Sequence, residues 1–363
     1  MKLCAMRALK SAYHRSASHS QAFLDAIANM KTFPVKKSLL EERALSEKLS
    51  SDYPIRNPVK CVLHRITMSD VYQIGTPDED FFLKIYRKSD KSEENIRDEV
   101  RLVNDLIDKE VPIPKPVHRN DGGYLTRIHA PEGERIAILF HAALGQEPQE
   151  ANKAHSHRFG RLIGKLHSCA DELNHEYKLK KIDENYLILD PVRYMKQYLE
   201  HREDDYNYLL QFGKDLAEEL ASKLDDSAPV YGICHGDVHT GNARMDDSGN
   251  ISIFDFDSSG YGWRVIDIGT YAVSYDWKDL TKEGKRKKES IWNHFLEGYN
   301  EWRPLTENEL SVLHLSMPIR QLELTGIGMQ KDAKYEGTHW ITDEFFDSLI
   351  KWLRDWLNKY SKY

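Results

Sequence analysis

The sequence lacks a long apolar run and contains few cysteines. No segment approaches the roughly 20 apolar residues that a membrane-spanning helix needs, so a membrane is not expected as a partner. The four cysteines are scattered along the 363 residues and make neither a zinc-binding pattern nor a disulfide framework. They are Cys4, Cys61, Cys169 and Cys234. We expect free thiols and a cytoplasmic location.

An excess of positive charge is also absent. Lysine and arginine number 51 against 58 aspartates and glutamates, which leaves a formal net charge of −7. Proteins that bind nucleic acid usually carry a basic domain or stripe, so nucleic acid is not expected as a partner. The one basic cluster, Lys282 to Lys288, is interpreted as a solvated connection between helices.

A glycine-rich phosphate-binding loop is missing as well. The pattern G-x-x-x-x-G-K-S/T occurs nowhere, which excludes a P-loop nucleotide-binding protein. The segment from Arg65 to Ile74, which precedes an apolar strand, contains no glycine until Gly75. Any phosphate-covering loop in this segment must therefore use other residues.

The most informative segment runs from His235 to Asp257. Ala243 to Met245 and Ile251 to Phe254 are expected to form a hairpin, because turn residues separate them. Centring the turn on Ser248 and Gly249 places Asn242 opposite Asp255. Mg²⁺ prefers hard oxygen ligands, so this amide and this carboxylate are candidate metal ligands.

Asp237 precedes Asn242 by the interval found in the catalytic loop of kinases. The segment repeats the H-x-D-x-x-x-x-N spacing in which the aspartate accepts the proton of the attacking hydroxyl and the asparagine holds a metal ion. Taken singly, each residue is better explained as a turn or cap former. Their conjunction, followed by Asp255-Phe256-Asp257, indicates phosphoryl transfer.

The motif His235-Gly-Asp-Val-His-Thr-Gly-Asn242 followed by Asp255-Phe-Asp257 resembles the signature of the aminoglycoside phosphotransferase and choline kinase superfamily. That resemblance implies an α+β, bilobal, protein-kinase-like fold. The small N-lobe would have an antiparallel sheet and one helix, and the larger C-lobe would be mostly helical. It also implies ATP and Mg²⁺ as cofactors, Asp237 as catalytic base and Asn242 and Asp255 as magnesium ligands.

A lysine and a glutamate upstream fit the nucleotide-binding part of a kinase. Lys84 lies inside the apolar strand Phe81 to Tyr86, where its ammonium group needs a partner. Glu99 lies on the buried edge of a helix expected from Ser92 to Lys109. Such a pair holds the ATP phosphates in kinases. The alternatives are a snorkelling lysine and a solvated glutamate, and Glu93 and Glu94 are weaker candidates for the partner.

Two further nucleotide contacts follow from the resemblance. Members of the superfamily often replace the loop glycines with serine, asparagine or aspartate, so Ser69 and Asp70 are compatible with phosphate binding. The apolar strand Ile136 to Gly145 is expected to lead into the hinge between the lobes. The adenine ring would then take hydrogen bonds from backbone between Phe140 and Ala142, although a plain core strand explains the pattern equally well.

The expected domains are an N-terminal extension (1–34), a nucleotide-binding N-lobe (35–138) and a C-lobe (139–363) with the catalytic loop, metal site and acceptor pocket. Apolar spacing and capping residues predict four C-lobe helices. These are Arg193 to Leu224, Arg286 to Tyr299, Glu307 to Met329 and Asp343 to Tyr360.

Several C-lobe residues are interpreted as structural. His155, His157 and His167 have no acidic partner at a spacing that suits a metal site, so they are expected to lie on a helix surface or to pack. Asp267 resembles the structural aspartate of the family, which braces the catalytic loop; an ordinary N-cap is the alternative.

The acceptor is the least determined part. Kinases of cationic acceptors use carboxylates and aromatic rings, and the C-terminal half offers Glu203, Asp204, Asp205, Glu323, Asp332, Glu336 and Trp340. An Arg320–Glu323 pair within one helix explains Glu323 equally well. The expected function is ATP- and Mg²⁺-dependent transfer of the γ-phosphoryl group to a hydroxyl of a small molecule resembling an aminoglycoside, choline or homoserine. The alternatives are a bacterial stress-type Ser/Thr protein kinase and a nucleotide-binding pseudokinase without turnover.

Overall fold

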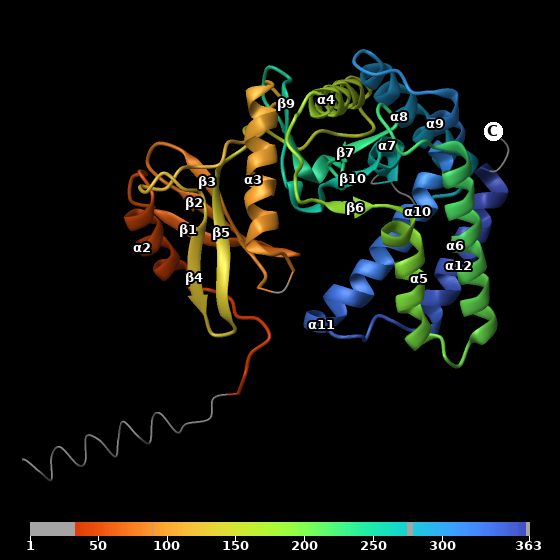
Figure 1. Cartoon of the computed structure of the whole chain (residues 1–363), viewed down its shortest axis with the longest axis horizontal. Helices are drawn as coiled ribbons and strands as arrows, with labels where there is room; N and C mark the ends of the chain where they lie inside the picture. The colour runs from red at the N-terminus through yellow and green to blue at the C-terminus, as the bar shows by residue number, and fades with distance from the viewer. Residues whose placement is uncertain (1–32, 89, 274–278, 361–363) are drawn as a thin grey trace, which may run out of the picture.

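The structure is a computed structural model of the whole chain, and it describes residues 33–88, 90–273 and 279–360. The expected N-terminal extension lies almost entirely outside these residues. Two lobes stand side by side, and α3 lies at the boundary between them (Figure 1). Among the helices of the described residues, none is both long and apolar enough to cross a lipid bilayer.

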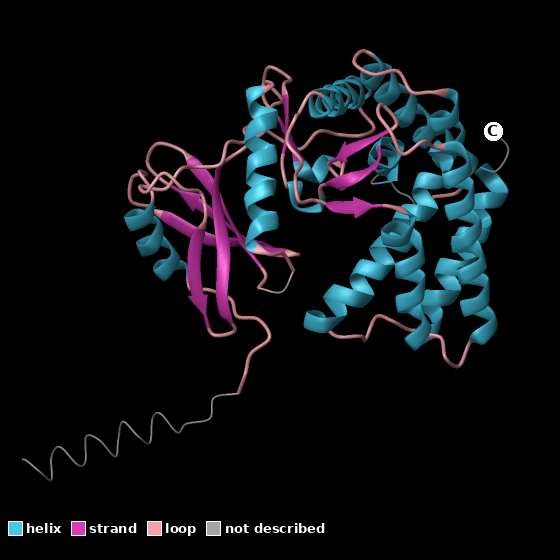
Figure 2. Ribbon diagram, in the orientation of Figure 1, coloured by secondary structure: helices cyan, strands magenta, loops and turns pink. Residues whose placement is uncertain are grey.

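The N-lobe is built on a five-stranded antiparallel sheet with the order β1-β2-β3-β5-β4. Its elements are α2 (Glu42–Asp52), β1 (Lys60–Ile66), β2 (Ser69–Gly75), β3 (Asp80–Tyr86), α3 (Glu93–Asp108), β4 (Thr126–Ala130) and β5 (Gly133–His141). The two helices lie on opposite sides of the sheet (Figure 2). Only α3 was predicted. β5 continues to His141, so the sheet extends past the expected lobe boundary at residue 138.

Burial on both faces of the central strands explains why both faces carry a helix. Leu45 and Leu49 of α2 pack with Tyr72 and Leu83 from one face of the sheet. The apolar stripe of α3, with Ile96 and Val100, packs against the other face. Because successive strand residues point to opposite faces, a strand as apolar as β3 needs cover on both sides.

The C-lobe is mostly helical and contains two small sheets. Its helices are α4 (Lys153–Asp171), α5 (Asp190–Met195), α6 (Glu203–Lys223), α7 (Arg264–Val273), α8 (Lys282–Asn300), α9 (Glu307–Val312), α10 (Ser316–Ile327), α11 (Ala333–Glu336) and α12 (Asp343–Tyr360). Its strands are β6 (Lys180–Ile182), β7 (Tyr231–Cys234), β8 (Ala243–Met245), β9 (Ile251–Ile253) and β10 (Gly260–Trp263). Short 3₁₀ or π turns lie at Asn185–Leu189, Lys196–Tyr198, Thr240–Asn242, Phe256–Ser258, Leu313–Leu315 and Gly328–Asp332.

Three expectations about the C-lobe need correction. The helix predicted from Arg193 to Leu224 is two helices, because the chain leaves helical geometry at Leu199 and re-enters at Glu203. The helix predicted from Glu307 to Met329 is likewise interrupted by a 3₁₀ turn. The basic run Lys282–Lys288 is the start of α8 and not a solvated connection. Lys288 is buried and donates to the Asp279 carbonyl over 2.6 Å, so the many lysines had hidden the apolar face of this helix.

The predicted hairpin is present, but its register differs by one residue. Ala243 pairs with Ile253 and Met245 with Ile251, and the Phe254 N–H donates to the Asn242 carbonyl over 2.9 Å. Asn242 therefore faces Phe254 and not Asp255. The turn residues Asp246 to Asn250 are compatible with either register, which is why the sequence did not decide between them.

Candidate active site

The catalytic loop leaves β7 at His235 and is held by backbone contacts. Asp267, near the start of α7, accepts hydrogen bonds from the His235 N–H over 2.6 Å and the Gly236 N–H over 2.7 Å. Gly236 has a φ of 79°, and a Cβ there would lie 2.2 Å from the Ser258 carbonyl oxygen. Only glycine suits both constraints. The His235 ring donates from Nε2 to the Phe254 carbonyl over 3.0 Å, which ties the loop to the hairpin.

Asp237 and Asn242 contact one another directly. The Asn242 amide nitrogen donates to the Asp237 carboxylate over 2.9 Å and to its backbone carbonyl over 3.1 Å. This leaves the side-chain carbonyl oxygen of Asn242 without a role in that contact. The five-residue interval of the motif thus places the two side chains together, as predicted.

The Asp237 carboxylate also forms an ion pair with Arg320 of α10. Arg320 in turn binds Glu323 over 2.7 Å, so the pair expected within one helix exists and extends to the loop. Burial would raise the pKa of Asp237, but Arg320 and the nearby His239 hold it well below its usual range. Asp237 is therefore ionised at neutral pH. The sequence offered no signal for the contact with Arg320.

Lys84 links the lobes through Asp255. Its ammonium nitrogen lies 2.8 Å from Asp255 Oδ1 and 3.4 Å from Glu99 Oε1. Burial would lower the pKa of Lys84, but Asp255, Asp257 and Glu99 raise it well above its usual value. Asp255 adopts a left-handed conformation with a φ of 67°, which is uncommon for a residue other than glycine and often marks functional sites.

Two further charged residues complete this cluster and were not predicted as site residues. Lys91 lies 2.5 Å from Glu99 Oε2 and 2.8 Å from Asp257 Oδ1. Asp257 also reaches Lys84 over 3.4 Å. The second aspartate of the Asp-Phe-Asp motif could have been proposed from the sequence, whereas Lys91 lies in a polar segment that gave no reason to single it out.

The weaker candidates for the partner of Lys84 lie elsewhere. Glu93 forms exposed ion pairs with Arg97 and Arg127, and Glu94 pairs with Lys178. Both face away from the cluster around Lys84. The helical period that placed Glu99 on the buried edge of α3 therefore selected the right glutamate.

A cavity of about 290 Å³ lies between the lobes beside this cluster. Its walls include most of the predicted nucleotide and metal residues. These are Lys84, Glu99, Phe140, Ala142, Asn242 and Asp255. Phe82 and Val71 line it from the N-lobe sheet, and Phe254 and Arg244 line it from the hairpin. A cavity lined by apolar side chains and by charged groups suits a heterocycle joined to a polyanion.

Ser69 is not among the residues that line this cavity. Its side chain is buried at the start of β2, where Ser69 pairs with Tyr86. The neighbouring Asp70 is also buried and binds Arg135 over 2.6 Å and Lys37 over 2.7 Å. Both residues thus serve the N-lobe core. Thr67, His64 and Arg65 reach the cavity instead, because the turn comes two residues earlier than the resemblance suggested.

The hinge segment lines the cavity but its N–H groups are partly used. The His141 N–H donates to the Lys115 carbonyl over 2.9 Å, and the Ala142 N–H donates to the Asp80 carbonyl over 3.0 Å. These two donors are not available to an adenine ring in this arrangement. The segment expected to recognise the base therefore contributes the apolar surface of Phe140 to the cavity wall.

Most of the carboxylates considered for an acceptor pocket lie elsewhere or are already paired. Asp205 binds Arg202 over 2.6 Å, and Arg202 also pairs with Asp347 of α12. Through Arg202, Asp205 thus connects the start of α6 to α12. Glu323 is the exception, because Arg320 connects it to Asp237. Trp340 packs edge-on against Phe345 with 5.2 Å between ring centroids, and the side chains of Asp332 and Glu336 lie outside the described residues.

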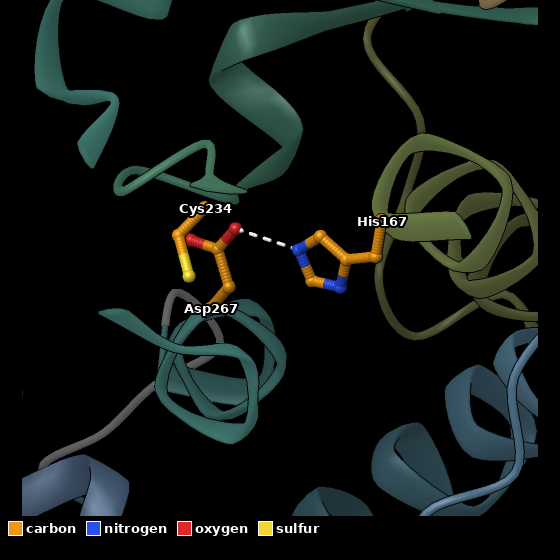
Figure 3. Close-up of side chains that lie close together, drawn as sticks. All are labelled: His167, Cys234 and Asp267. Carbon is orange, nitrogen blue, oxygen red and sulfur yellow. Dashed lines mark hydrogen bonds and ion pairs between the residues drawn. The ribbon is translucent and has the colours of Figure 1, made fainter. Parts of the chain in front are cut away.

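A sealed polar cluster lies directly behind the catalytic loop. His167 of α4 points at Asp267, while Cys234 at the end of β7 lies next to both (Figure 3). His167 Nε2 donates to Asp267 over 3.1 Å, so the histidine does meet an acidic partner that its sequence spacing did not reveal. Among the described residues, this is the only group of three such side chains with ligand atoms close enough for a metal ion.

This cluster is satisfied without a metal ion. Both oxygens of Asp267 already accept backbone N–H groups, and His167 uses its second nitrogen with the Tyr299 hydroxyl over 2.9 Å. Burial raises the pKa of the Cys234 thiol well above its usual value, whereas a metal would need the thiolate. The expected bracing role of Asp267 agrees with this geometry.

A five-stranded antiparallel lobe joined to a helical lobe, with a lysine–aspartate pair between them, defines the protein-kinase-like fold of small-molecule kinases. A model described as the phosphotransferase enzyme family matches residues 66–305. The chain belongs to this phosphotransferase family, and it is a kinase whose acceptor is an alcohol group.

Individual relatives are similar to this chain over most of its length. An uncharacterised protein of Synechocystis sp. is 31% identical over 285 residues, which cover 77% of each chain. Amicoumacin kinase of Bacillus subtilis is 24% identical over 303 residues, or 81% of this chain and 86% of its own. A solved structure of amicoumacin kinase with AMP-PNP, Ca²⁺ and its acceptor superposes with a TM-score of 0.70 at 20% identity, covering 88% of this chain and 94% of that one. This last likeness is one of fold.

Proposed function

We propose that the protein transfers the γ-phosphoryl group of ATP, with Mg²⁺, to a hydroxyl of a small molecule. The observation that carries the proposal is the convergence of Lys84, Asp255 and Asn242 on one inter-lobe cavity. Lys84, braced by Glu99, would hold the phosphates. The amicoumacin kinase structure, solved with AMP-PNP and Ca²⁺, supports a nucleotide and a divalent cation here.

The residues present suit Mg²⁺. Asp255 contributes a carboxylate of which Lys84 occupies one oxygen, and Asn242 contributes an amide carbonyl oxygen that its contact with Asp237 leaves over. A small number of protein oxygens, completed by water and phosphate, is the usual way in which proteins bind this ion. Bound there, the ion would supply charge neutralisation at the transferring phosphoryl group.

Asp237 would orient the acceptor hydroxyl and receive its proton. The lowered pKa keeps its carboxylate ionised and able to accept a hydrogen bond, while it makes the group a weak base. That combination suits phosphoryl transfer, in which positioning and electrostatic stabilisation outweigh early proton removal. Arg320 would share the carboxylate with the hydroxyl and fix its orientation.

Among acceptors, a small molecule is the first choice. The family relation to amicoumacin kinase supports it, because that relative is named for a small-molecule acceptor. Glu323, held by Arg320 beside Asp237, is the carboxylate best placed to contact an acceptor amine. A protein Ser/Thr acceptor remains the second choice. A pseudokinase is disfavoured, because the positions of base, metal ligands and lysine are all filled.

The experiment that tests the proposal is ADP release from Mg-ATP with a panel of hydroxyl acceptors. The panel contains aminoglycosides, choline, ethanolamine, homoserine, methylthioribose, amicoumacin and a generic protein substrate. The Asp237→Asn variant is the control. We expect its rate of ADP release to be about 10²–10⁴-fold lower, which is the usual contribution of a general base. Its melting temperature should stay close to that of the unchanged protein.

Each outcome has a defined meaning. Stimulation by one small molecule fixes the acceptor class, and mass increase of the protein itself or of the protein substrate favours the second choice. A rate in Asp237→Asn that equals that of the unchanged protein contradicts the assignment of the base. Thermal stabilisation by Mg-ATP without ADP release from any acceptor favours the pseudokinase.

A further inference from the structure

A second cavity lies at the tip of the N-lobe sheet, next to the nucleotide cavity. It has a volume of about 630 Å³ and is lined by the segment Val35–Leu39, by Ile66 and Arg87 of the N-lobe, and by Tyr335 of α11. Ile66 ends β1, and the next residue, Thr67, lines the nucleotide cavity. The second cavity is therefore built by both lobes. It lies beside the turn between β1 and β2, whose Thr67 lines the nucleotide cavity.

Arg87 is buried in this cavity with part of its hydrogen-bonding capacity unused. Its side chain follows β3 and is 4% exposed. One nitrogen, Nη2, donates to the Thr67 carbonyl, but Nε and Nη1 have no hydrogen-bond partner within the described part of the chain. The guanidinium carbon lies 4.5 Å from the centre of the Tyr335 ring. A buried charge with unpaired N–H groups is costly, so this arrangement indicates a missing oxygen ligand.

The charged residues around Arg87 favour an anion. Lys36 is exposed and donates only to the Lys334 carbonyl, over 3.4 Å. Lys37 is neutralised by Asp70. Among the described residues that line the cavity there is no carboxylate. Two carboxylates contact the lining from outside it: Asp70 binds Lys37 over 2.7 Å, and Glu132 accepts the Ser38 hydroxyl over 2.8 Å.

We propose that this cavity binds an oxyanion, a phosphate or carboxylate group, through Arg87 and Lys36. The Nε and Nη1 groups of Arg87 can each donate a charge-assisted hydrogen bond to an oxygen of such a group. Tyr335 of the C-lobe lines the same cavity and lies over the guanidinium, so the anion would bind between the two lobes. The group belongs either to the acceptor or to a separate small ligand; the chemistry is the same.

Calorimetric titration with inorganic phosphate tests the site directly, without and with saturating Mg-ADP. Binding that Mg-ADP abolishes belongs to the nucleotide cavity. Binding that persists with Mg-ADP and is weakened by Arg87→Gln belongs to the second cavity. We expect the persisting affinity to fall about tenfold or more in Arg87→Gln, because a charge-assisted pair of hydrogen bonds is lost. Lys36→Gln, which removes an exposed side chain and leaves the fold unaffected, should lower it by a few-fold.

Lys88→Gln is the matched control, because Lys88 is the exposed neighbour of Arg87 and donates to the Glu132 carbonyl outside the cavity. It should leave phosphate affinity unchanged. No phosphate binding in the presence of Mg-ADP, or equal affinity in Arg87→Gln, Lys36→Gln and Lys88→Gln, overturns the proposal. The phosphate titration does not require catalytic turnover, so its outcome is independent of the ADP-release assay.

A kinetic measurement then identifies the source of the anion. If the group belongs to the acceptor, phosphate competes with the acceptor found in the panel, and Arg87→Gln raises its KM with little change in kcat. If a separate ligand occupies the site, phosphate leaves the KM of the acceptor unchanged while still binding through Arg87. Both results require an anion site at Arg87, and they differ only in whether the acceptor or a separate ligand occupies it.

Discussion

Asp255 and Asp267 lie close together in the sequence, yet their surroundings differ in one decisive respect. The side chain of Asp267 is 2% exposed, and both its oxygens accept hydrogen bonds from the protein itself. The side chain of Asp255 is 36% exposed and lines the inter-lobe cavity, with one oxygen bound to Lys84. The Asp267 carboxylate is therefore fully hydrogen-bonded within the protein, whereas the Asp255 carboxylate is available to a ligand.

The two aspartates belong to two clusters with different roles, one sealed by the protein and one open to the cavity. His167, Cys234 and Asp267 form a rigid support from which His235 and Gly236 extend. Lys84, Glu99 and Asp255 meet where a ligand can enter. Three ligand-type side chains in contact do not by themselves make a metal site; what matters is whether their lone pairs and protons are already engaged.

Replacing Asp267 should have the largest effect on stability. An asparagine there loses one charge-assisted acceptor and turns an NH₂ group toward a backbone N–H, so we expect Asp267→Asn to lose roughly 3–5 kcal/mol of the free energy of unfolding. Urea denaturation measures this loss. Asp255→Asn is the matched control and should lose under about 1 kcal/mol. Similar losses in the two variants would erase the distinction between the sealed and the open carboxylate.

The sealed cluster should also make stability depend on pH. Burial lowers the pKa of His167 to about 4, whereas an unfolded histidine titrates near its ordinary value of 6.5. The folded state thus binds fewer protons in this window. Its contribution is complete above pH 6.5 and is lost as pH falls toward 4, by about 3 kcal/mol in all.

Urea denaturation at intervals between pH 7 and 4 measures this dependence. The glutamine of His167→Gln cannot titrate. In this variant the free energy of unfolding should therefore change less between pH 6.5 and 4 than in the unchanged protein. An identical slope in the two proteins would mean that His167 does not remain neutral in the fold.

Removing Asp255 should weaken nucleotide binding while the sealed cluster stays intact. Loss of groups that only support a metal ligand costs about 10- to 100-fold in metal affinity, so Asp255→Ala should weaken Mg-ADP binding by at least that factor. Calorimetry measures it. Lys165→Ala is a suitable control, because Lys165 donates to the Glu110 carbonyl at an exposed position. Unchanged affinity in Asp255→Ala would remove this residue from the metal site.

A chelator provides the smallest expected effect. Because the sealed cluster has internal partners for its polar atoms, EDTA should leave the melting temperature of the nucleotide-free protein unchanged within about 1 °C. Under the same conditions it should abolish any stabilisation by Mg-ADP. A marked fall in the melting temperature of the nucleotide-free protein would indicate that His167, Cys234 and Asp267 hold a resident ion after all.

Much of the site could be predicted because its signals are local. Asp237 and Asn242 share one loop, and their interval brings them into contact at 2.9 Å. Glu99 was selected over Glu93 and Glu94 by helical period alone. Where the signal was weaker, the predictions failed: a turn sequence compatible with two registers misplaced Asn242 by one residue, and family analogy placed Ser69 in a cavity that its buried side chain does not reach.

What the sequence by itself determined is a set of candidate residues, each placed by spacing along a loop, strand or helix: Asp237 as the proposed base, Asn242 and Asp255 as the proposed oxygen ligands, and Lys84. What only the tertiary structure decided is which distant groups meet them. Lys84 reaches Asp255 across 171 residues, and Arg320 reaches Asp237 across 83. Periodicity fixes neighbours within one element, but contacts between remote elements depend on how the lobes and helices pack, and no interval in the chain encodes that packing.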